Sequence, residues 1–586
     1  MSLYTFSMVM IALGALFAVV TLAYVLRMAF SRQAGEIGGW EIRGAARRIA
    51  AVARTTIAEG VRTKAALGFA LLVLASVPLF WLIAEGDGTI KGKVQMFITY
   101  SLGFAGFVLS LLTILFSCRS LSNEIATRQI YGIVSKPVPR WQILTGKWVG
   151  VMSLNVILLG LVGLGTYVGT KAITWQFKGQ LRHELTTSGG LTPKQSDDAV
   201  AALDRVRGIG KTGMESPVIT AMTQATGMSR KQIGDVLLKL PEPTRVNLRR
   251  FDELRRQVLV ARASVHPPIP DLTEAIEKRY REMEQTDTLP ELMTPGEIRK
   301  HIATELAGSV RTVPPGTGRV WKLKGPKPEE RRDFIMSVRF KLRVAATIPA
   351  LRNPDTGELL EEETVLCVWT VGDPRTANSL EHLDTQPANT YKELELPTNC
   401  IESDGTIVLT FLNIDPRNND VIFDYPDGLE VLYRVGSFGI NVFQACLATL
   451  VPLACLSSLG VCASSFLSFP VGSLIIGCLY LISISMGFVA ESLAVSEEYA
   501  PDPTRRGLDW EVRRMTVNAI GTILSVGGLD PTNQLIDGRT IDWSVPWHSP
   551  LRESLSKWPF ALLKSIVILM IGVLVFRRRE LAAVIV

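Results

Sequence analysis

The sequence predicts an α-helical polytopic membrane protein with about seven transmembrane helices and one large extracytoplasmic α+β insert. The 586 residues are 47% hydrophobic and have a positive mean hydropathy, so the composition is that of a membrane protein. Uncharged runs long enough to cross a bilayer recur along the chain, and polar character dominates residues 173–435 between two of them. The predicted spans lie at about 5–30, 65–84, 96–118, 148–170, 437–461, 466–490 and 559–576.

Residues 1–39 are predicted to form an N-terminal transmembrane anchor. Arg27 and Arg32 follow the apolar run, whereas a cleavable signal peptide carries its basic residues before the run. We therefore expect a retained anchor with the N-terminus outside the cytoplasm. Residues 40–64 place apolar side chains on one helical face and arginines on the other, which predicts an interfacial helix. The alternative is a helix that packs against the next cytoplasmic segment.

That segment, 119–147, lies between the third and fourth spans, within a first membrane half at 65–172. It carries five Lys/Arg and one acid, Glu124, so we expect it on the cytoplasmic side. Apolar spacing predicts a helix from Ser120 to about Ser135, and prolines from position 137 onward end it. The prediction is a short surface helix tied between two spans; the alternative is an ordinary basic loop.

The insert at 173–435 divides into a helical part, 180–312, and a β-rich part, 319–433. The helical periodicity gives candidate helices at 194–207, 229–239, 244–262, 272–284 and 295–306. Period-two alternation gives candidate strands at 338–344, 364–371, 391–396, 406–414, 421–423 and 429–433. These strands predict a β-sandwich or a jelly-roll-like module. Cys367 and Cys400 either pair in it or are two buried thiols.

Residues 436–586 are predicted to hold the second membrane half, with three spans and an external loop at 491–557. Arg577 and its two arginine neighbours place the C-terminal end in the cytoplasm. We predict a multi-pass protein of a bacterial cytoplasmic (inner) membrane, with the insert in the periplasm or outside.

Several site classes are not expected. The GKT at 210–212 lacks the earlier glycine of a phosphate-binding loop and follows a helix. The histidines and cysteines show no metal-ligand spacing, so we expect no metal site. We also expect no catalytic residues and no cofactor in this chain. The net charge of +7 sits mostly beside the spans, which indicates membrane lipid and not nucleic acid as its partner.

Three features of the chain resemble ABC type-2 exporter permeases. They are the helix before the second span, the Phe-Arg-Arg-Arg-Glu-Leu sequence at 576–581 and the pattern Glu124 … Tyr131-Gly132-Ile133 … Ser135-Lys136-Pro137-Val138-Pro139-Arg140 … Gly146-Lys147. The resemblance implies a permease subunit without its own ATPase, paired with a second permease copy or homologue and driven by a separate ATP-binding subunit. It implies that 40–64 is an elbow helix and that 120–135 is a coupling helix. The residues expected to couple to the ATPase subunit are Glu124, Arg128, Tyr131, Lys136, Pro137 and Arg140.

Asn155, Asn441 and Gln444 lie inside predicted spans, where buried amides either meet another helix or line a transport pathway. A different class of function is an envelope scaffold or sensor whose spans only anchor the outer domain. A membrane-embedded enzyme is a third class, but the spans carry no constellation of acids, histidines or metal ligands for it. The substrate is not indicated by the sequence.

Overall fold

A computed structural model describes the chain from residue 40 to residue 578 with internal gaps. The gaps are 63, 130–137, 206–216, 269–270, 287, 290–292, 326–335, 346–363, 373–378, 397–399, 403, 424–427, 499–534, 536–537 and 540–556. The predicted first span at 5–30 therefore lies outside the described residues.

Helices occupy all six predicted spans that fall in the described part of the chain. These helices are α3 (Lys64–Ile83), α4 (Ile90–Ala126), α6 (Arg140–Thr187), α13 (Phe438–Ser464), α14 (Phe469–Glu498) and α18 (Lys557–Arg578). Three of them, α4, α6 and α13, are long and apolar enough to cross a bilayer on their own. A fourth span results if α3 is counted with the helix before it, α2 (Trp40–Arg62), from which it bends by 75°. A membrane protein is thus confirmed, while seven spans remain a prediction.

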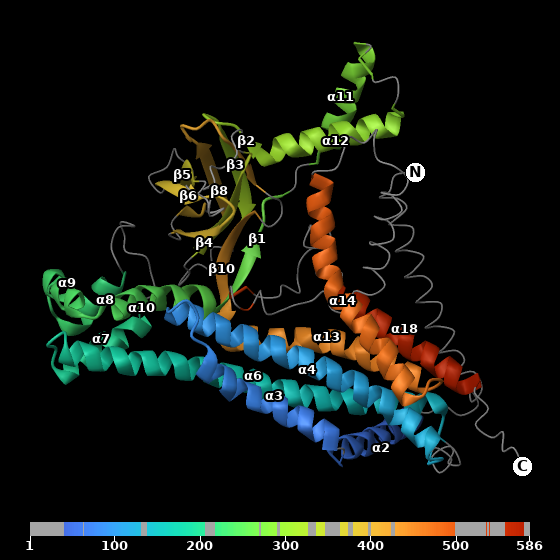
Figure 1. Ribbon diagram of the computed structural model, residues 1–586. Helices are drawn as coiled ribbons and strands as arrows, with labels where there is room; N and C mark the ends of the chain where they lie inside the picture. Colours follow the sequence, from blue (N-terminus) through green and yellow to red (C-terminus); the bar gives the residue numbers. More distant parts are fainter. Residues whose placement is uncertain are drawn as a thin grey trace, which may run out of the picture.

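The two longest helices extend past the predicted spans. α6 has 48 residues, which at about 1.5 Å per residue exceeds a bilayer of about 30 Å more than twofold. Its last turns lie in the region that the sequence assigned to the insert. Figure 1 shows α7–α10 at the end where α6 finishes, and α2 near the opposite end. The insert and the 119–147 segment therefore lie at opposite ends of α4 and α6, as the topology prediction requires.

The first part of the insert is helical and packs on the membrane helices. It contains α7 (Pro193–Arg205), α8 (Pro217–Thr226), α9 (Arg230–Lys239), α10 (Glu242–Glu253) and a π-helical turn, η1 (Leu254–Val258). α9 begins with a capping box between Ser229 and Gln232. The predicted helix at 244–262 is wrong in its last turn, because the chain there turns into strand β1 (Val260–Val265). This strand pairs with β10, and pairing overrides the local helical periodicity.

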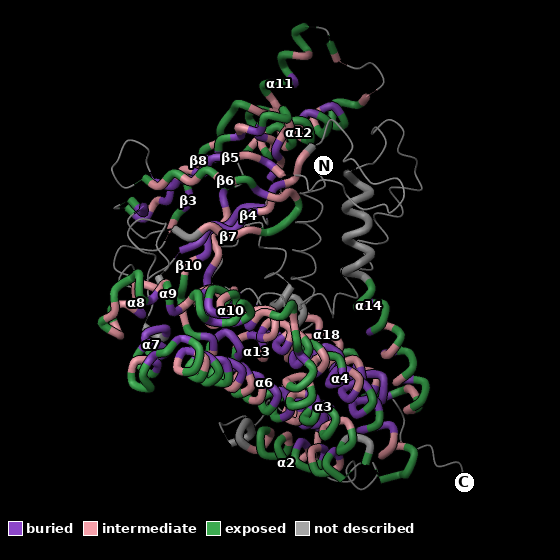
Figure 2. The backbone as a smooth tube through the Cα atoms, turned by 60° about the vertical axis from the view of Figure 1, so that its left-hand side comes forward, coloured by how far each residue is buried: buried purple, intermediate pink, exposed green. Residues whose placement is uncertain are grey.

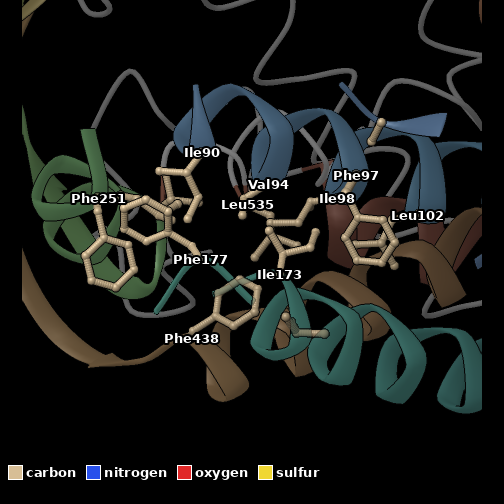
Figure 3. Close-up of a cluster of buried hydrophobic side chains, with 14 of the residues drawn as sticks. Ile90, Val94, Phe97, Ile98, Leu102, Ile173, Phe177, Phe251, Phe438 and Leu535 are labelled. Atoms are coloured by element: carbon tan, nitrogen blue, oxygen red, sulfur yellow. The ribbon is translucent and has the colours of Figure 1, made fainter. Parts of the chain in front are cut away.

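One apolar core joins these helices to the membrane helices. Ile90 and Phe97 of α4 belong to the same buried cluster as Phe177 of α6, Phe251 of α10 and Phe438 of α13. Figure 3 shows these side chains together where the helices meet. The rings of Phe177 and Phe251 lie 5.2 Å apart between centroids. Because the core is continuous, the helical part of the insert is expected to move with α4 and α6.

The second part of the insert is β-rich, as predicted. Its strands are β2 (Thr312–Val313), β3 (Gly318–Lys324), β4 (Met336–Ala345), β5 (Thr364–Val371), β6 (Leu380–Pro387), β7 (Tyr391–Leu396), β8 (Thr406–Asn413), β9 (Asp420–Phe423) and β10 (Leu429–Ser437). One antiparallel sheet has the order β1-β10-β4-β9-β2 with β7 beside β4, and the other has the order β3-β8-β5-β6. The sequence missed β1, β2, β3 and β6.

The two sheets share a core of their own. Trp369 of β5 is fully buried and lies 4.6 Å from Phe340 of β4 between ring centroids. Trp321, Phe411 and Phe423 belong to the same aromatic cluster. Figure 2 shows the buried stretches of the strands set apart from those of the membrane helices. Cys367 and Cys400 are buried thiols that form no disulfide, so of the two alternatives the structure shows two buried thiols.

Two further elements attach to this β-rich part. The helices α11 (Thr273–Gln285) and α12 (Pro295–Arg311) form a hairpin that projects away from the membrane helices (Figure 1). Gly538, which lies between α14 and α18 in the chain, contacts β1: its carbonyl accepts a hydrogen bond of 2.7 Å from the Arg262 amide. Gly538 has φ +64°, and a Cβ there would lie 2.0 Å from the Gln257 carbonyl oxygen. Glycine is therefore required at this contact.

Candidate coupling site

The 119–147 segment is described at its two ends. α4 continues without a break through the start of the predicted surface helix and ends at Ala126, so the structure shows no separate helix beginning at Ser120. A turn follows at 127–129, and α6 starts at Arg140. Three of the residues expected to couple, Tyr131, Lys136 and Pro137, lie outside the described residues.

Glu124 is held inside the protein. Its Oε1 lies 2.8 Å from Nζ of Lys147, whose side chain is only 2% exposed, while the side chain of Glu124 is 16% exposed. The Lys147 ammonium also donates a hydrogen bond of 2.6 Å to the Ser120 carbonyl. An ion pair of this kind compensates the cost of burying two charges only when both partners remain. The pair fastens the end of α4 to the start of α6.

Arg128, the second charged residue expected to couple to the ATPase subunit, does not share the helix of Glu124. It lies beyond the end of α4 with φ +61°, a left-handed backbone that is uncommon for a residue other than glycine. Its amide donates to the Ile125 carbonyl at 3.2 Å, which closes the turn. The side chain is exposed. Arg128 is therefore placed where a second protein can reach it, and Glu124 is not.

Arg140 contacts the last helix of the chain. Its Nη1 donates to the carbonyls of Phe576 at 2.7 Å and Arg577 at 2.9 Å, and its guanidinium lies 5.6 Å from the centre of the Phe576 ring. The last carbonyls of a helix have no partner within the helix, so a cation there is favourable. Phe576 is buried against Leu121 and neighbouring residues. Arg140 thus joins the 119–147 segment to α18.

α2 packs against the same end of α6. A Cβ on Gly146 would lie 2.6 Å from Cβ of Val52, and one on Gly150 would lie 2.7 Å from Cβ of Thr56. Two glycines one turn apart let the helix backbones approach closely. Nε of Arg48 donates to the Gln142 side chain at 2.8 Å. The apolar face of α2 that the sequence placed toward lipid is therefore occupied, in part, by α6.

The three candidate pathway residues differ in their surroundings. Asn155 exchanges hydrogen bonds of 2.9 and 3.1 Å with the Thr113 side chain, so it joins α6 to α4. In the part of the chain that the structure describes, Nδ2 of Asn441 and Oε1 of Gln444 are buried without a hydrogen-bond partner. The hydrogen bonds between α6 and α4 explain why the Asn155 amide is buried. They do not explain the buried amides of Asn441 and Gln444 on α13.

Lys147 and Gln142 were missed as site residues by the sequence reasoning. The sequence did contain a signal for Lys147, because a lysine directly beside an apolar span favours an acidic partner, and Glu124 is the one acid of the 119–147 segment. Among the described residues, no group of His, Cys, Asp and Glu has the arrangement of a metal site.

A comparison with protein families matches this part of the chain. Residues 3–187 match the family model described as ABC-2 family transporter protein. Residues 3–187 are therefore similar to proteins of the ABC-2 transporter family. The matched residues include α2, α3, α4, all of α6 and the coupling segment between them, so the resemblance seen in the sequence is confirmed. No curated protein and no solved structure matches the chain.

Proposed function

We propose that this chain is the permease subunit of an ABC-type exporter, which moves an unidentified substrate across the cytoplasmic membrane. The observation that carries the proposal is the family match over 3–187, which includes the segment between α4 and α6. In this proposal ATP is bound and hydrolysed by a separate subunit, and this chain holds no cofactor. A second permease copy or homologue completes the transporter.

The contacts of the coupling segment support a mechanical role. Glu124–Lys147 ties α4 to α6, Arg140 ties α6 to α18, and the glycines of α6 seat α2. A push on the turn at 127–129 would therefore reach four helices, α4, α6, α18 and α2, through direct contacts. Such a push biases a two-state equilibrium between inward- and outward-facing forms if one form binds the ATP-loaded subunit better.

Arg128 is the described residue that we assign to contact with the ATP-binding subunit. It is exposed and lies at the tip of the described turn, while Glu124 and Arg140 have partners inside the chain. Exposed charges contribute little to stability, at most about 1 kcal/mol, so its removal should leave the fold intact. Removing a charge that is buried at a protein interface costs about 2–5 kcal/mol of binding.

The test compares Arg128→Ala with Arg249→Ala, an exposed arginine on α10 at the opposite end of the helices. Tagged proteins are purified from native membranes, and the bound ATP-binding subunit is quantified. We expect wild type and Arg249→Ala to retain it and Arg128→Ala to lose most of it at equal expression. Equal retention by both variants would remove Arg128 from the interface, and absence of the subunit from wild type would refute the exporter.

The scaffold or sensor alternative is less favoured, because the membrane region itself matches a transporter family. A protein that only anchors an outer domain has no need for a fixed link between α4, α6 and α18 at the opposite end of the helices.

A further inference from the structure

A groove lies beside the coupling site, between the bend that joins α2 to α3 and the end of α4. It has a volume of about 800 Å³ and is lined by Thr55, Ala58, Glu59, Arg62, Lys64, Arg119 and Asn123. Three cations thus face one carboxylate, Glu59. That carboxylate already interacts with Lys147 and Arg119. The groove therefore has an excess of positive charge that its own acid does not neutralise.

The cations come from three different elements. Arg62 ends α2 and Lys64 begins α3, on either side of the 75° bend, while Arg119 lies on α4. Within the described ranges, neither Arg62 nor Lys64 has an ion pair or a side-chain hydrogen bond. The bend brings two positive charges together beside a third. Like charges held together in this way favour the binding of an anion.

An apolar surface continues from each wall of the groove toward the membrane. On α3, Leu67 and Leu71 follow Lys64 along one helical face and are 50% and 60% exposed. On α4, Leu115 precedes Arg119 by one turn on the same face and is 36% exposed. A ligand in the groove would therefore meet cations at one end and exposed leucines at the other.

We propose that this groove binds the phosphate headgroup of an anionic phospholipid, whose acyl chains lie against the leucines of α3 and α4. A phosphate accepts hydrogen bonds from several donors at once, and arginine and lysine are its usual partners. Cations beside a membrane also concentrate anionic lipid. The site is distinct from the contact with the ATP-binding subunit and does not depend on it.

Delipidated full-length protein in detergent is titrated with phosphatidylglycerol, phosphatidylcholine or glycerol 3-phosphate, and occupancy is followed by native mass spectrometry. The groove variant is Arg62→Gln with Lys64→Gln. The control is Arg47→Gln with Arg54→Gln, which removes the same charge from exposed positions of α2 outside the groove. Thermal unfolding of each variant verifies that the fold is retained, and Arg119→Gln alone provides a second groove variant.

We expect phosphatidylglycerol to bind wild type and the control with similar affinity. It should bind the groove variant about 25-fold more weakly, since each of the two cations removed contributes about fivefold beside an anionic surface. Arg119→Gln alone should weaken binding about fivefold on the same scale. Equal losses in the groove variant and the control would show general surface charge and overturn the site. Binding of glycerol 3-phosphate as tight as that of the lipid would show a free-phosphate site and overturn the lipid assignment, as would equal affinity for phosphatidylcholine.

Discussion

Removing one partner of the Glu124–Lys147 pair is the most informative perturbation of the coupling site. Glu124→Ala leaves a lysine ammonium in a position where the side chain is 2% exposed. Breaking a buried pair in this way costs about 3–5 kcal/mol. We expect the lower end of this range, because the Ser120 carbonyl still accepts a hydrogen bond from Lys147 and Glu59 lies within electrostatic reach. The variant is therefore destabilised, although the sequence had suggested that Glu124 was an exposed interface residue.

Lys147→Met removes the more deeply buried charge and leaves Glu124 at 16% exposure. Leaving a partly buried acceptor without a donor costs about 1–3 kcal/mol, which is less than in the first variant. Combining both substitutions removes both charges, and a buried pair replaced by apolar side chains is often close to neutral. We therefore expect Lys147→Met to restore most of the stability that Glu124→Ala loses.

The assay is thermal unfolding of the purified protein in one detergent, at fixed lipid content, followed by tryptophan fluorescence. The predicted order of Tm is Glu124→Ala lowest, Lys147→Met next, and the double variant close to wild type. If the losses of the two single variants add in the double variant, the two side chains do not act as a pair and the reasoning is refuted.

Three further predictions follow from other contacts. Gly146→Val, whose Cβ would lie 2.6 Å from Val52, should separate α2 from α6 and lower Tm, at a cost of about 1–3 kcal/mol, whereas Gly160→Val, with open space around it, should not. An impermeant maleimide given to cells with a permeabilised outer membrane should label Ser309→Cys on α12 and not Thr127→Cys; the reverse pattern would invert the topology. Burial raises the pKa of Glu393, but the Arg262 guanidinium at 2.8 Å outweighs it and holds that pKa below 4.5. The Arg262–Glu393 pair therefore contributes its full stabilisation above about pH 4.5, and this contribution is lost as the pH falls through the lowered pKa of Glu393. Arg262→Met should therefore reduce the dependence of the free energy of unfolding on acid pH. An unchanged pH profile would contradict this.

The sequence was most informative where a local pattern decides the structure. α2 was expected at 40–64 and occupies Trp40–Arg62, because one helical face is apolar over its whole length. β5 was expected at 364–371 and occupies Thr364–Val371. Composition also predicted where the helices of the membrane region lie, because an uncharged segment in a bilayer can satisfy its backbone hydrogen bonds in few ways other than as a helix.

It was least informative where partners distant in the chain decide the structure. β1 is a strand because β10, far along the chain, pairs with it. Glu124 was expected to be exposed on an amphipathic helix. The helical pattern does not reveal that Lys147, 23 positions later, forms an ion pair with Glu124. Arg140 caps α18 because this last helix packs beside the 119–147 segment, and no short sequence motif predicts that contact.

The central claim is that this chain works with a separate ATP-binding subunit. The most direct measurement is the ATP hydrolysis rate of the tagged protein purified gently from its native membranes and reconstituted in lipid. The account predicts hydrolysis that co-purifies with a second polypeptide and falls when Arg128→Ala replaces wild type, but not with Arg249→Ala. Pure chain with no associated subunit and no hydrolysis above background would contradict it.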